Sequence, residues 1–459
     1  MGRMDSRRVM TTSSKVVYPV SRYMPRSVYH PPFHRRILPW VFAVIFLVTA
    51  PLLVFYTSGY RFNPNKTSIE RNGTLIVDST PRSARVFLND RDVNDFTPTT
   101  LQNLAPGPYS IRVIRDGYLP WEKVLDLKPE QVTFANTISL WADTSPVLLQ
   151  EGFFTQVSAS DDGATLAVID STSTQCIFYT TDNRRIQSVA LPKNLTTSPQ
   201  PLRWNQNGTA VVLGGANLND TAWWTTPDAL SRDSGLLPPG QYFWDQNTLI
   251  GYDLQKQYTL NTRLRTLATI KLSDAKLGTL EGLTLALNTS TGFLNLRSES
   301  ILHKVFQLPN GNWQFAGQKD DYTLLKDGNR WLSARIRADG NFAEQMVGDW
   351  PRWLPSSDKP TALFLNQNEI WRWQLGDQAE LIARQSEPFV QVAWHPDGNT
   401  IFVANAKEVY ALELDDRGGK QKTSLATFDE VFDFAYADGS LFIAAQKDGV
   451  RGLYQRVVD

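Results

Sequence analysis

The chain has very little cysteine and histidine. Among its 459 residues there is one cysteine, Cys176, and there are four histidines. A single cysteine rules out an intrachain disulfide framework. The chain does not need one, because a portion of several hundred residues buries enough apolar surface without cross-links. We therefore expect its stability to come from ordinary hydrophobic cores.

The motifs of several enzyme classes are also missing. The sequence contains neither the Gly-x-Ser-x-Gly elbow of serine hydrolases nor a glycine-rich phosphate loop. His30 and His34 flank Pro31-Pro32, which prevents the helix that would bring both imidazoles to one zinc ion. The segment from Ser160 lacks the spacing and the aromatic residue of a sialidase box. We predict no catalytic residue, metal ligand or cofactor.

Neither sign of charge is in excess. The chain has 46 basic and 46 acidic residues, but eight of the basic residues and one of the acidic ones lie in residues 1–36. The part from Ile37 onward therefore carries 38 basic and 45 acidic residues. This mild acidity argues against a nucleic-acid partner.

No charged residue occurs between Ile37 and Tyr60. At about 1.5 Å per residue a helix of this length spans the roughly 30 Å core of a bilayer. The basic residues before it predict a cytoplasmic N-terminus, and Trp40 and Tyr56 stand near its ends, where aromatic side chains favour the headgroup region. We predict an uncleaved signal-anchor helix at residues 37–60 in the lipid bilayer, with the later residues outside the cytoplasm.

Two other interpretations of this apolar run fit less well. A cleaved secretory signal would have a shorter apolar region and a small-x-small cleavage site. A buried core helix would show a polar stripe.

The segments on both sides of the apolar run are polar. Residues 1–36 mix Pro, Tyr, Ser and Arg without hydrophobic periodicity, which predicts a disordered cytoplasmic tail. It acts as a topology signal or contacts anionic lipids or a cytoplasmic partner. Residues 61–72 cannot bury a core and are predicted to be a linker. Fully extended, it reaches no more than about 40 Å, so the next folded unit stays close to the membrane.

Residues 73–141 show the pattern of a small all-β domain. Short runs rich in Val, Ile, Leu and aromatic residues alternate with turn residues such as Pro106-Gly107. Tyr109, Ile111 and Val113 would share the buried face of one strand. The predicted strands are Thr74–Asp78, Arg85–Leu88, Tyr109–Ile114, Trp121–Leu127 and Val132–Leu140.

This region resembles the PEGA domain of bacterial and archaeal surface proteins. The resemblance rests on the strand before Pro81, the turn at Pro98, the run Leu104-Ala105-Pro106-Gly107-x-Tyr109 and the pair Gly117-Tyr118. The tetrapeptide that names the family is degenerate here, Pro81-Arg82-Ser83-Ala84, and keeps its outer residues. The resemblance implies an envelope-associated, sandwich-like interaction module without known catalytic residues.

One segment of the module begins like a calcium-binding loop. Asp90-x-Asp92-x-Asn94 has the spacing of the first ligands, but Asp95 and Leu101 stand where that loop requires glycine and glutamate. We interpret the segment as a polar turn between strands.

Residues 146–459 repeat loosely. A strand, a turn with Asp, Asn or Gly, and a second strand recur about every 39 to 45 residues, the period of a propeller blade. We predict an eight-bladed β-propeller, with seven blades as the alternative because the fourth and fifth repeats are weak. The last repeat is one strand short, so Pro146–Gln150 is predicted to complete it and close the ring.

The turns Trp394-His395-Pro396-Asp397-Gly398 and Ser160-Asp161-Asp162-Gly163 resemble those of WD-repeat and TolB-type propellers. This resemblance implies a rigid ring whose loops bind proteins, peptides or glycans. A hydrogen-bonding role in its turn is predicted for His395. Trp223-Trp224 and Trp371-Arg372-Trp373 could stack on sugars, but large aromatic residues at alternate strand positions normally fill the space between blades.

These observations predict an all-β protein outside one N-terminal transmembrane helix. Its expected role is that of a non-catalytic binding scaffold in the cell envelope, with a cell-wall, polysaccharide or protein partner outside the cytoplasm. The residues that bind the partner are not predicted. One alternative is an envelope hydrolase or lyase, since acidic residues from different blades could meet at the ring centre without any local pattern. Another is signalling across the membrane through the tail.

Overall fold

The computed structural model describes residues 33–57 and 60–63 and, with gaps of one to six residues, residues 68–459. Between residues 272 and 306 it describes the backbone only. The chain divides into two compact units, residues 1–71 and residues 72–459. The predicted tail lies almost entirely outside the described residues.

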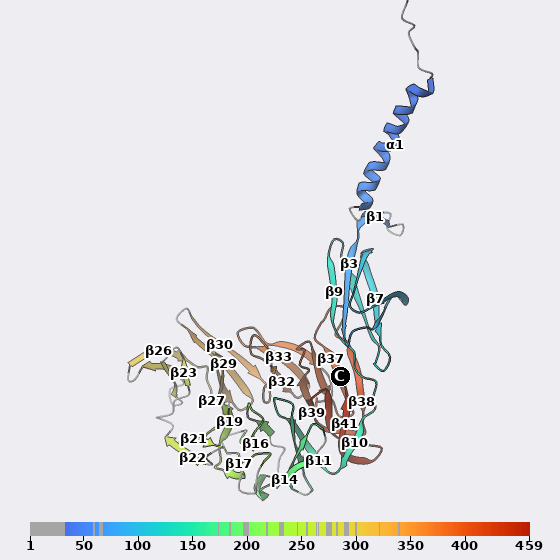
Figure 1. Cartoon of the computed structure of the whole chain (residues 1–459). Coiled ribbons are helices and arrows are strands. Elements are labelled where there is room, and N and C mark those ends of the chain that lie inside the picture. The colour runs from blue at the N-terminus through green and yellow to red at the C-terminus, as the bar shows by residue number, and fades with distance from the viewer. Residues whose placement is uncertain are drawn as a thin grey trace, which may run out of the picture. The chain divides into compact units, whose positions relative to one another are not determined.

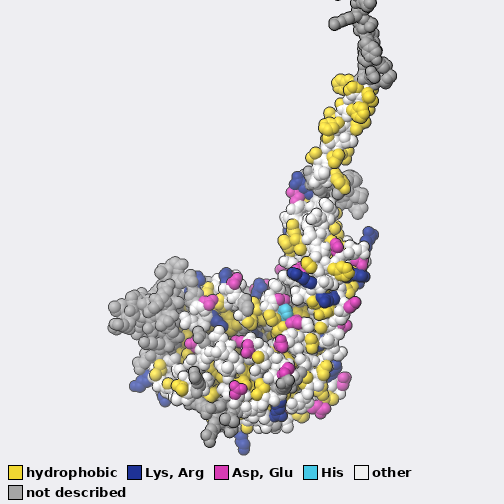
Figure 2. Space-filling view, viewed as in Figure 1, with side chains coloured by type: hydrophobic (Ala, Val, Ile, Leu, Met, Phe, Trp, Pro, Cys, Tyr) yellow, Lys and Arg dark blue, Asp and Glu magenta, His cyan; other side chains and the backbone are white. Residues whose placement is uncertain are grey.

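In the first unit, α1 (Phe33–Thr57) is an apolar helix. Its stretch Ile37–Val54 is long and apolar enough to cross a membrane, and Figure 2 shows its hydrophobic side chains on the surface. The Thr49 hydroxyl donates a hydrogen bond to the Ile45 carbonyl, one turn earlier in the helix. The helix begins at Phe33, four residues before the predicted 37–60 segment. It ends at Thr57, before the end of that segment, because Tyr60 already belongs to a strand.

The predicted linker contains a short hairpin. Strands β1 (Tyr60–Asn63) and β2 (Ser68–Arg71) pair antiparallel, with Phe62 opposite Ile69. Four-residue strands are too short to show a period of two, which is why the sequence indicated only a polar tether.

Residues 72–142 form the β module, which consists of two sheets (Figure 1). The first has the order β5-β4-β7-β8 and the second β6-β3-β9, in which β3 and β9 run parallel. Ile111 and Val113 are fully buried between the sheets, as the alternation predicts. The strands are β3 (Gly73–Thr80), β4 (Arg85–Leu88), β5 (Arg91–Phe96), β6 (Thr99–Leu104), β7 (Gly107–Ile114), β8 (Trp121–Leu127) and β9 (Val132–Ser139).

Two strands of the β module were not predicted. Strand β5 is almost wholly exposed on both faces, so it carries no hydrophobic alternation, and it contains Asp92 and Asn94. The interpretation of Asp90–Asn94 as one polar turn is therefore wrong beyond Asp90. The Asp90 carboxylate lies near Arg112, and the Asp92 carboxylate lies near Arg85.

Beyond Ser145 the chain forms eight four-stranded antiparallel sheets. The first four are β11 (Phe154–Ala159), β12 (Thr165–Asp170), β13 (Gln175–Thr180) and β14 (Arg185–Ala190); β15 (Leu202–Trp204), β16 (Val211–Gly214), β17 (Ala222–Thr225) and β18 (Ser234–Leu237); β19 (Gln241–Asp245), β20 (Thr248–Tyr252), β21 (Lys256–Asn261) and β22 (Thr266–Lys271); and β23 (Gly278–Leu280), β24 (Leu283–Asn288), β25 (Phe293–Ser298) and β26 (Ile301–Gln307). A 3₁₀ turn, Lys193–Leu195, lies between the first two.

The other four sheets continue the repeat. They are β27 (Gln314–Lys319), β28 (Tyr322–Asp327), β29 (Arg330–Arg337) and β30 (Gly340–Val347); β31 (Arg352–Trp353), β32 (Thr361–Asn366), β33 (Glu369–Gln374) and β34 (Glu380–Arg384); β35 (Gln391–Trp394), β36 (Thr400–Ala404), β37 (Glu408–Glu413) and β38 (Lys422–Thr427); and β39 (Glu430–Ala437), β40 (Ser440–Lys447), β41 (Val450–Val457) and β10 (Val147–Glu151). The strand predicted to complete the last repeat is β10, which pairs with β41.

The first strands of the sheets other than β23–β26 lie next to one another and form the inside of a ring. Strand β11 lies against β15 and β39, and β35 lies against β31 and β39. Strand β19 lies against β27, where the rings of Phe243 and Phe315 meet at 5.3 Å. The sheet β23–β26 does not separate these two strands. This contact favours the seven-bladed alternative for the ring itself, with β23–β26 as an additional sheet.

Tryptophans link neighbouring first strands. In three sheets the indole N–H of the first strand donates to a backbone carbonyl on the preceding sheet of the ring, which satisfies a polar group inside an apolar interface. The pairs are Trp204 with Ser158 at 3.2 Å, Trp244 with Arg203 at 3.0 Å and Trp394 with Arg352 at 2.9 Å. The repeated Trp near the end of the first strand is thus a structural element.

Candidate functional site

The β module is joined to the sheet β35–β38 by buried charges. The Lys123 side chain on β8 is only 2% exposed, and its ammonium lies 3.4 Å from both the Glu413 and the Asp415 carboxylates. It also donates to the Asp415 carbonyl at 2.8 Å, and the Trp121 indole donates to Glu413. We call Trp121, Lys123, Glu413 and Asp415 the clamp. Its groups satisfy one another, which a buried charge requires.

The clamp shifts the acidities of its carboxyl groups in opposite directions. Burial raises the pKa of Glu413 despite its bonds to Trp121 and Lys123. Burial would also raise the pKa of Asp415, but the hydrogen bonds from Arg417 and the charge of Lys123 outweigh it and lower that pKa to about 2. Arg417 in addition donates to the carbonyl of Phe134 on β9, at 2.8 Å. Asp415 is thus ionised at any ordinary pH and balances Lys123.

Gly418 allows the backbones to approach at this interface. It has a φ of 68°, and a Cβ atom at this position would lie 1.8 Å from the carbonyl oxygen of Val124 on β8. A side chain there would have to displace the β module.

His395 lies at the same junction between two carboxylates. Its Nδ1 is 2.9 Å from Asp397 and its Nε2 is 3.4 Å from Asp459. Burial alone would lower the pKa of His395, but the hydrogen bonds and charges of these two carboxylates raise it to about 9. The Trp141 ring stands edge-on at 5.2 Å, and Asp397 accepts a hydrogen bond from Ser139 of the β module. The predicted hydrogen-bonding role in the turn is therefore observed, with ionic partners in addition.

A chain of polar side chains crosses the inner strands β31, β35, β39 and β11. Arg352 pairs with Asp349 at 2.8 Å and donates to Gln391 at 2.7 Å, and Gln391 donates to Asp433 at 2.8 Å. The other Asp433 oxygen accepts the backbone N–H of Val157 at 3.0 Å. Burial raises the pKa of Asp433 to about 6, against the effect of these hydrogen bonds and of Arg352. The chain of bonds holds neighbouring sheets in register.

The ring of Trp350 makes cation–π contacts with two positively charged side chains from other sheets. The Arg203 guanidinium lies 4.0 Å from the centre of its ring, and the Lys326 ammonium lies 5.1 Å away. Lys326 also donates to the carbonyl of Ala216 at 3.1 Å. Burial and the charge of Arg203 lower the pKa of Lys326 to about 8. Cation–π contacts of this kind hold parts of the ring that are distant in sequence.

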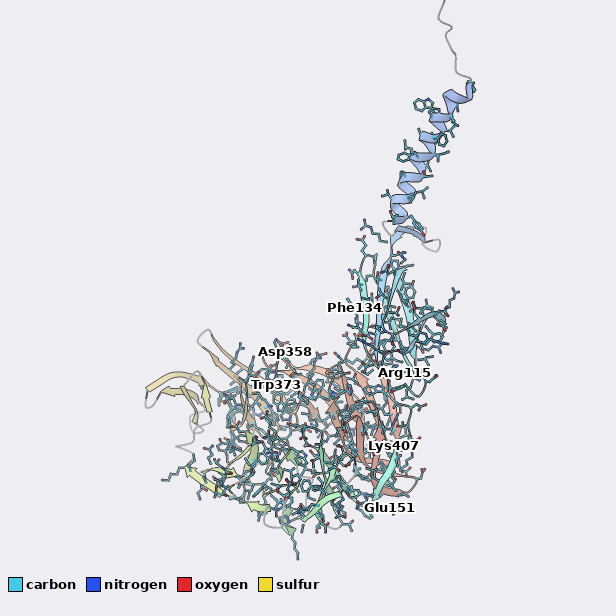
Figure 3. All side chains as sticks on the ribbon, in the orientation of Figure 1. Arg115, Phe134, Glu151, Asp358, Trp373 and Lys407 are labelled. Atoms are coloured by element: carbon cyan, nitrogen blue, oxygen red, sulfur yellow. The ribbon has the colours of Figure 1, made fainter. Side chains whose placement is uncertain are left out.

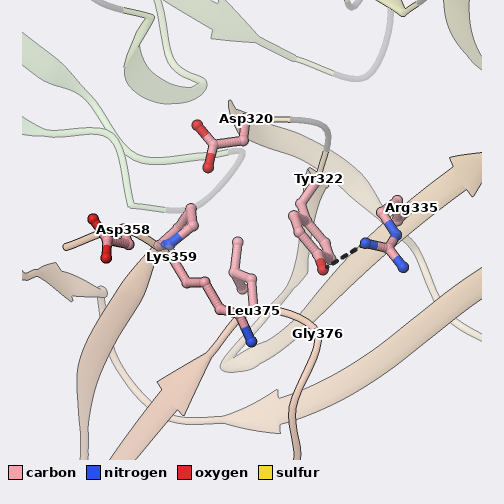
Figure 4. A pocket seen from close by; sticks show the side chains of 8 residues that line it. Asp320, Tyr322, Arg335, Asp358, Lys359, Leu375 and Gly376 are labelled. Atoms are coloured by element: carbon pink, nitrogen blue, oxygen red, sulfur yellow. Dashed lines mark hydrogen bonds between the residues drawn. The ribbon is translucent and has the colours of Figure 1, made fainter.

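An open pocket lies between the sheets β27–β30 and β31–β34 (Figure 4). It has a volume of about 370 Å³. Its lining consists of Asp320, Tyr322, Arg335, Asp358, Lys359, Pro360, Leu375 and Gly376. Asp320 lies in the turn between β27 and β28, and Asp358 and Lys359 lie between β31 and β32. The turns between first and second strands thus place charges of both signs around one cavity.

These charges are weakly compensated. Arg335 donates to the Tyr322 hydroxyl at 3.2 Å and has no ionic partner among the described residues. Within the same residues no hydrogen bond or ion pair engages the carboxyl group of Asp320 or Asp358. Lys359 lies 3.5 Å from Asp377, and both side chains are exposed. The pocket therefore holds charged groups that remain available to a ligand.

Three of the four tryptophans considered for sugar stacking are core residues. Trp223, Trp224 and Trp373 are 2%, 5% and 0% exposed, and the Trp373 indole donates to Glu344. Trp371 is half-buried and donates to Glu369 on its own strand. The interpretation that these tryptophans fill space inside the fold therefore holds for Trp223, Trp224 and Trp373.

Sequence reasoning did not find the pocket. Its charged residues are Asp320 and the adjacent pair Asp358-Lys359, which lie in turns, and Arg335 on β29, and together they form no sequence motif. The one available signal was the position of Asp320, Asp358 and Lys359 between the first and second strands of neighbouring repeats. Among the described residues, no group of three or more His, Cys, Asp or Glu side chains could hold a metal ion.

One protein-family model matches part of the chain. Residues 72–138 match the PEGA domain family. No curated protein matches the chain.

Solved structures similar to the chain include three proteins. Apo AztD from Citrobacter koseri is 11% identical, with 63% of this chain and 88% of that chain covered and a TM-score of 0.40. The β-propeller domain of Cps50 (Swd1) from Myceliophteria thermophila is 10% identical, with 68% and 100% covered and a TM-score of 0.42. Virginiamycin B lyase from Staphylococcus aureus is 10% identical, with 68% and 97% covered and a TM-score of 0.40.

Proposed function

We propose that the chain is a non-catalytic binding scaffold of the cell envelope, anchored by α1, that holds its β module and ring outside the cytoplasm for a protein or glycan partner. A PEGA domain joined to a β-propeller suggests a binding or scaffold role. The apolar stretch Ile37–Val54 supports the anchor. The eight basic residues before it support a cytoplasmic N-terminus.

The observation that carries this proposal is the division of charges in residues 72–459. The clamp residues are buried and paired, so they fix the β module to the ring. The pocket charges are accessible and largely unpaired, so they are available to a partner. A rigid body with a free polar cavity is what a scaffold needs, because a preorganised site loses little entropy on binding.

Capture of a partner by the full-length protein tests the proposal. The protein, reconstituted in lipid nanodiscs, is immobilised and exposed to solubilised envelope proteins and to a glycan array. We expect one class of partner to be retained by the wild type and by Lys128→Ala, an exposed substitution on the β module. Retention of neither class above empty nanodiscs would contradict the scaffold role.

The topology requires its own measurement. Cysteines introduced at exposed positions Asp126 and Glu387 should react with a membrane-impermeant maleimide in intact cells. Cys176 is buried and serves as the internal negative control. Labelling only after lysis would place residues 72–459 in the cytoplasm and refute the anchor topology.

Asp433 is the observation that favours the alternative of a hydrolase or lyase. It lies on an inner strand, and its pKa is raised to about 6, as for a carboxyl group poised for acid–base chemistry. Against this, both of its oxygens accept hydrogen bonds from the protein. Turnover of an envelope polysaccharide by the wild type that is lost in Asp433→Asn, with unchanged folding, would establish the enzyme.

A further inference from the structure

The pocket between β27–β30 and β31–β34 separates its two signs of charge. Figure 4 shows the carboxyl groups of Asp320 and Asp358 on one side and the guanidinium of Arg335 on the other. The Lys359 side chain extends between them, below Leu375. A ligand that is neutral overall but carries both signs would match this arrangement.

Arg335 is prepared to receive a carboxylate. It is half-buried, and its guanidinium lies 5.3 Å from the centre of the Tyr322 ring, which holds it in place. One N–H of its guanidinium donates to the Tyr322 hydroxyl. The other N–H donors of this planar group can form two parallel hydrogen bonds to a carboxylate. Lys359 can add a second positive charge, because its exposed pair with Asp377 is weak.

Asp320 and Asp358 are suited to an ammonium group. Both are exposed turn residues, and neither carboxyl group has a hydrogen-bonding or ionic partner in the described part of the chain. They would repel an all-anionic ligand, while Arg335 and Lys359 would repel an all-cationic one. Charge complementarity of this kind rejects wrong ligands more than it adds affinity.

The lining argues against a sugar in this pocket. Tyr322 is its aromatic residue, and it is only 7% exposed, so its ring offers no face for stacking. The volume of about 370 Å³ is at the lower end of the range for small-ligand sites. It suits a molecule of a few residues rather than a folded domain.

We propose that this pocket binds the zwitterionic form of a short peptide, with its ammonium group between Asp320 and Asp358 and its carboxylate on Arg335 and Lys359. The inference rests on the proposed binding function and assigns a ligand class to it. No covalent step is involved.

Tripeptides of alanine with free or blocked ends test the assignment. Binding to the full-length protein in nanodiscs is measured by calorimetry for the free peptide, the N-acetylated peptide, the C-amidated peptide and the doubly blocked peptide. We expect the free peptide to bind and each block to weaken binding by about tenfold, since each removes one charge-assisted contact. Equal binding of all four peptides, or binding of none, would overturn the proposal.

Substitutions assign each peptide end to its side of the pocket. Arg335→Gln should remove the penalty for C-amidation and leave the penalty for N-acetylation. Asp358→Asn and Asp320→Asn should do the reverse, and asparagine also tolerates the positive φ of 50° at residue 320. Lys407→Gln removes an exposed charge away from the pocket and is the matched control (Figure 3). Loss of both penalties in any one variant would contradict the assignment.

The two proposals fail separately. If the nanodisc protein retains an envelope partner that the Arg335 and Asp358 variants also retain, and no peptide binds, the scaffold function stands and the pocket assignment fails. If the array instead shows a glycan whose binding these variants abolish, the pocket is a binding site of another class.

Discussion

The clamp and the pocket contain the same kinds of charged side chain in opposite circumstances. In the clamp, Lys123 is buried between Glu413 and Asp415 and every group has a partner. In the pocket, Arg335 and Lys359 face Asp320 and Asp358 across a cavity open to solvent. Desolvated charges must be paired to be tolerated, whereas solvated ones need no partner. Charge that is paired and buried therefore serves structure here, and charge that lines the open pocket without a strong partner is available to a ligand.

The largest expected effect comes from breaking the clamp. Lys123→Ala would leave the buried Glu413 uncompensated, which costs about 3–5 kcal/mol. We expect the β module to unfold separately from the ring, visible as two calorimetric transitions, and the chain to be cut by proteases between residues 142 and 147. Lys128→Ala, on an exposed position of the same module, should unfold like the wild type. A single unshifted transition for Lys123→Ala would show that the clamp is not what joins the two parts.

A pH-dependent contribution at the same junction is expected from His395. Its pKa is raised to about 9 in the folded state, from an ordinary value near 6.5. The folded state thus holds the proton more tightly, so this contribution is complete below pH 6.5 and is lost as the pH rises towards 9. Between pH 6.5 and 8 the loss should be about 2 kcal/mol.

His395→Gln measures that contribution by difference. The unfolding free energy of the variant should fall about 2 kcal/mol less than that of the wild type between pH 6.5 and 8. The window stops at pH 8 because Lys326 acts in the opposite sense above it: its lowered pKa of about 8 makes the folded state more favourable as the pH rises. Parallel pH profiles for the two proteins would mean that His395 is not charged at neutral pH.

A smaller change separates the β module's own stability from that of the clamp. Ser83 adopts a φ of 64°, a left-handed conformation that suits glycine. Ser83→Gly should therefore stabilise the β module by up to about 1 kcal/mol, read from the first transition in the Lys123→Ala background. Ser83→Ala keeps the strain and should bring no gain. Stabilisation by alanine as well would point to the serine hydroxyl instead.

The smallest expected effect concerns the pocket. Lys359→Gln removes an exposed charge whose nearest carboxylate is 3.5 Å away and also exposed. The unfolding free energy should change by less than about 0.5 kcal/mol. Chemical denaturation of this variant beside Lys123→Ala compares the two regions directly. A cost comparable to that of Lys123→Ala would remove the distinction between them.

The sequence predicted the parts of the fold that local patterns encode. The uncharged stretch after Ile37, the alternation on β7 and the recurrent strand-turn-strand period can each be recognised along the chain without knowledge of which distant residues meet. The missing fourth strand of the last repeat also indicated β10, because an unpaired edge requires a partner. Strand β5 could not be predicted in this way, because it is exposed on both faces and therefore shows no apolar alternation.

By itself, then, the sequence determined an apolar helix, a PEGA-like β module and a repeating all-β region. Only the tertiary structure decided which charges meet. Lys123 and Glu413 are 290 residues apart, and Asp320 and Arg335 reach the pocket of Lys359 from another sheet. The packing of the β module on β35–β38 and of β27–β30 against β31–β34 creates these neighbours, and no short-range pattern records them. The same residue types became a clamp at one position and an open pocket at another because burial, which sets the cost of an unpaired charge, is a property of the folded chain.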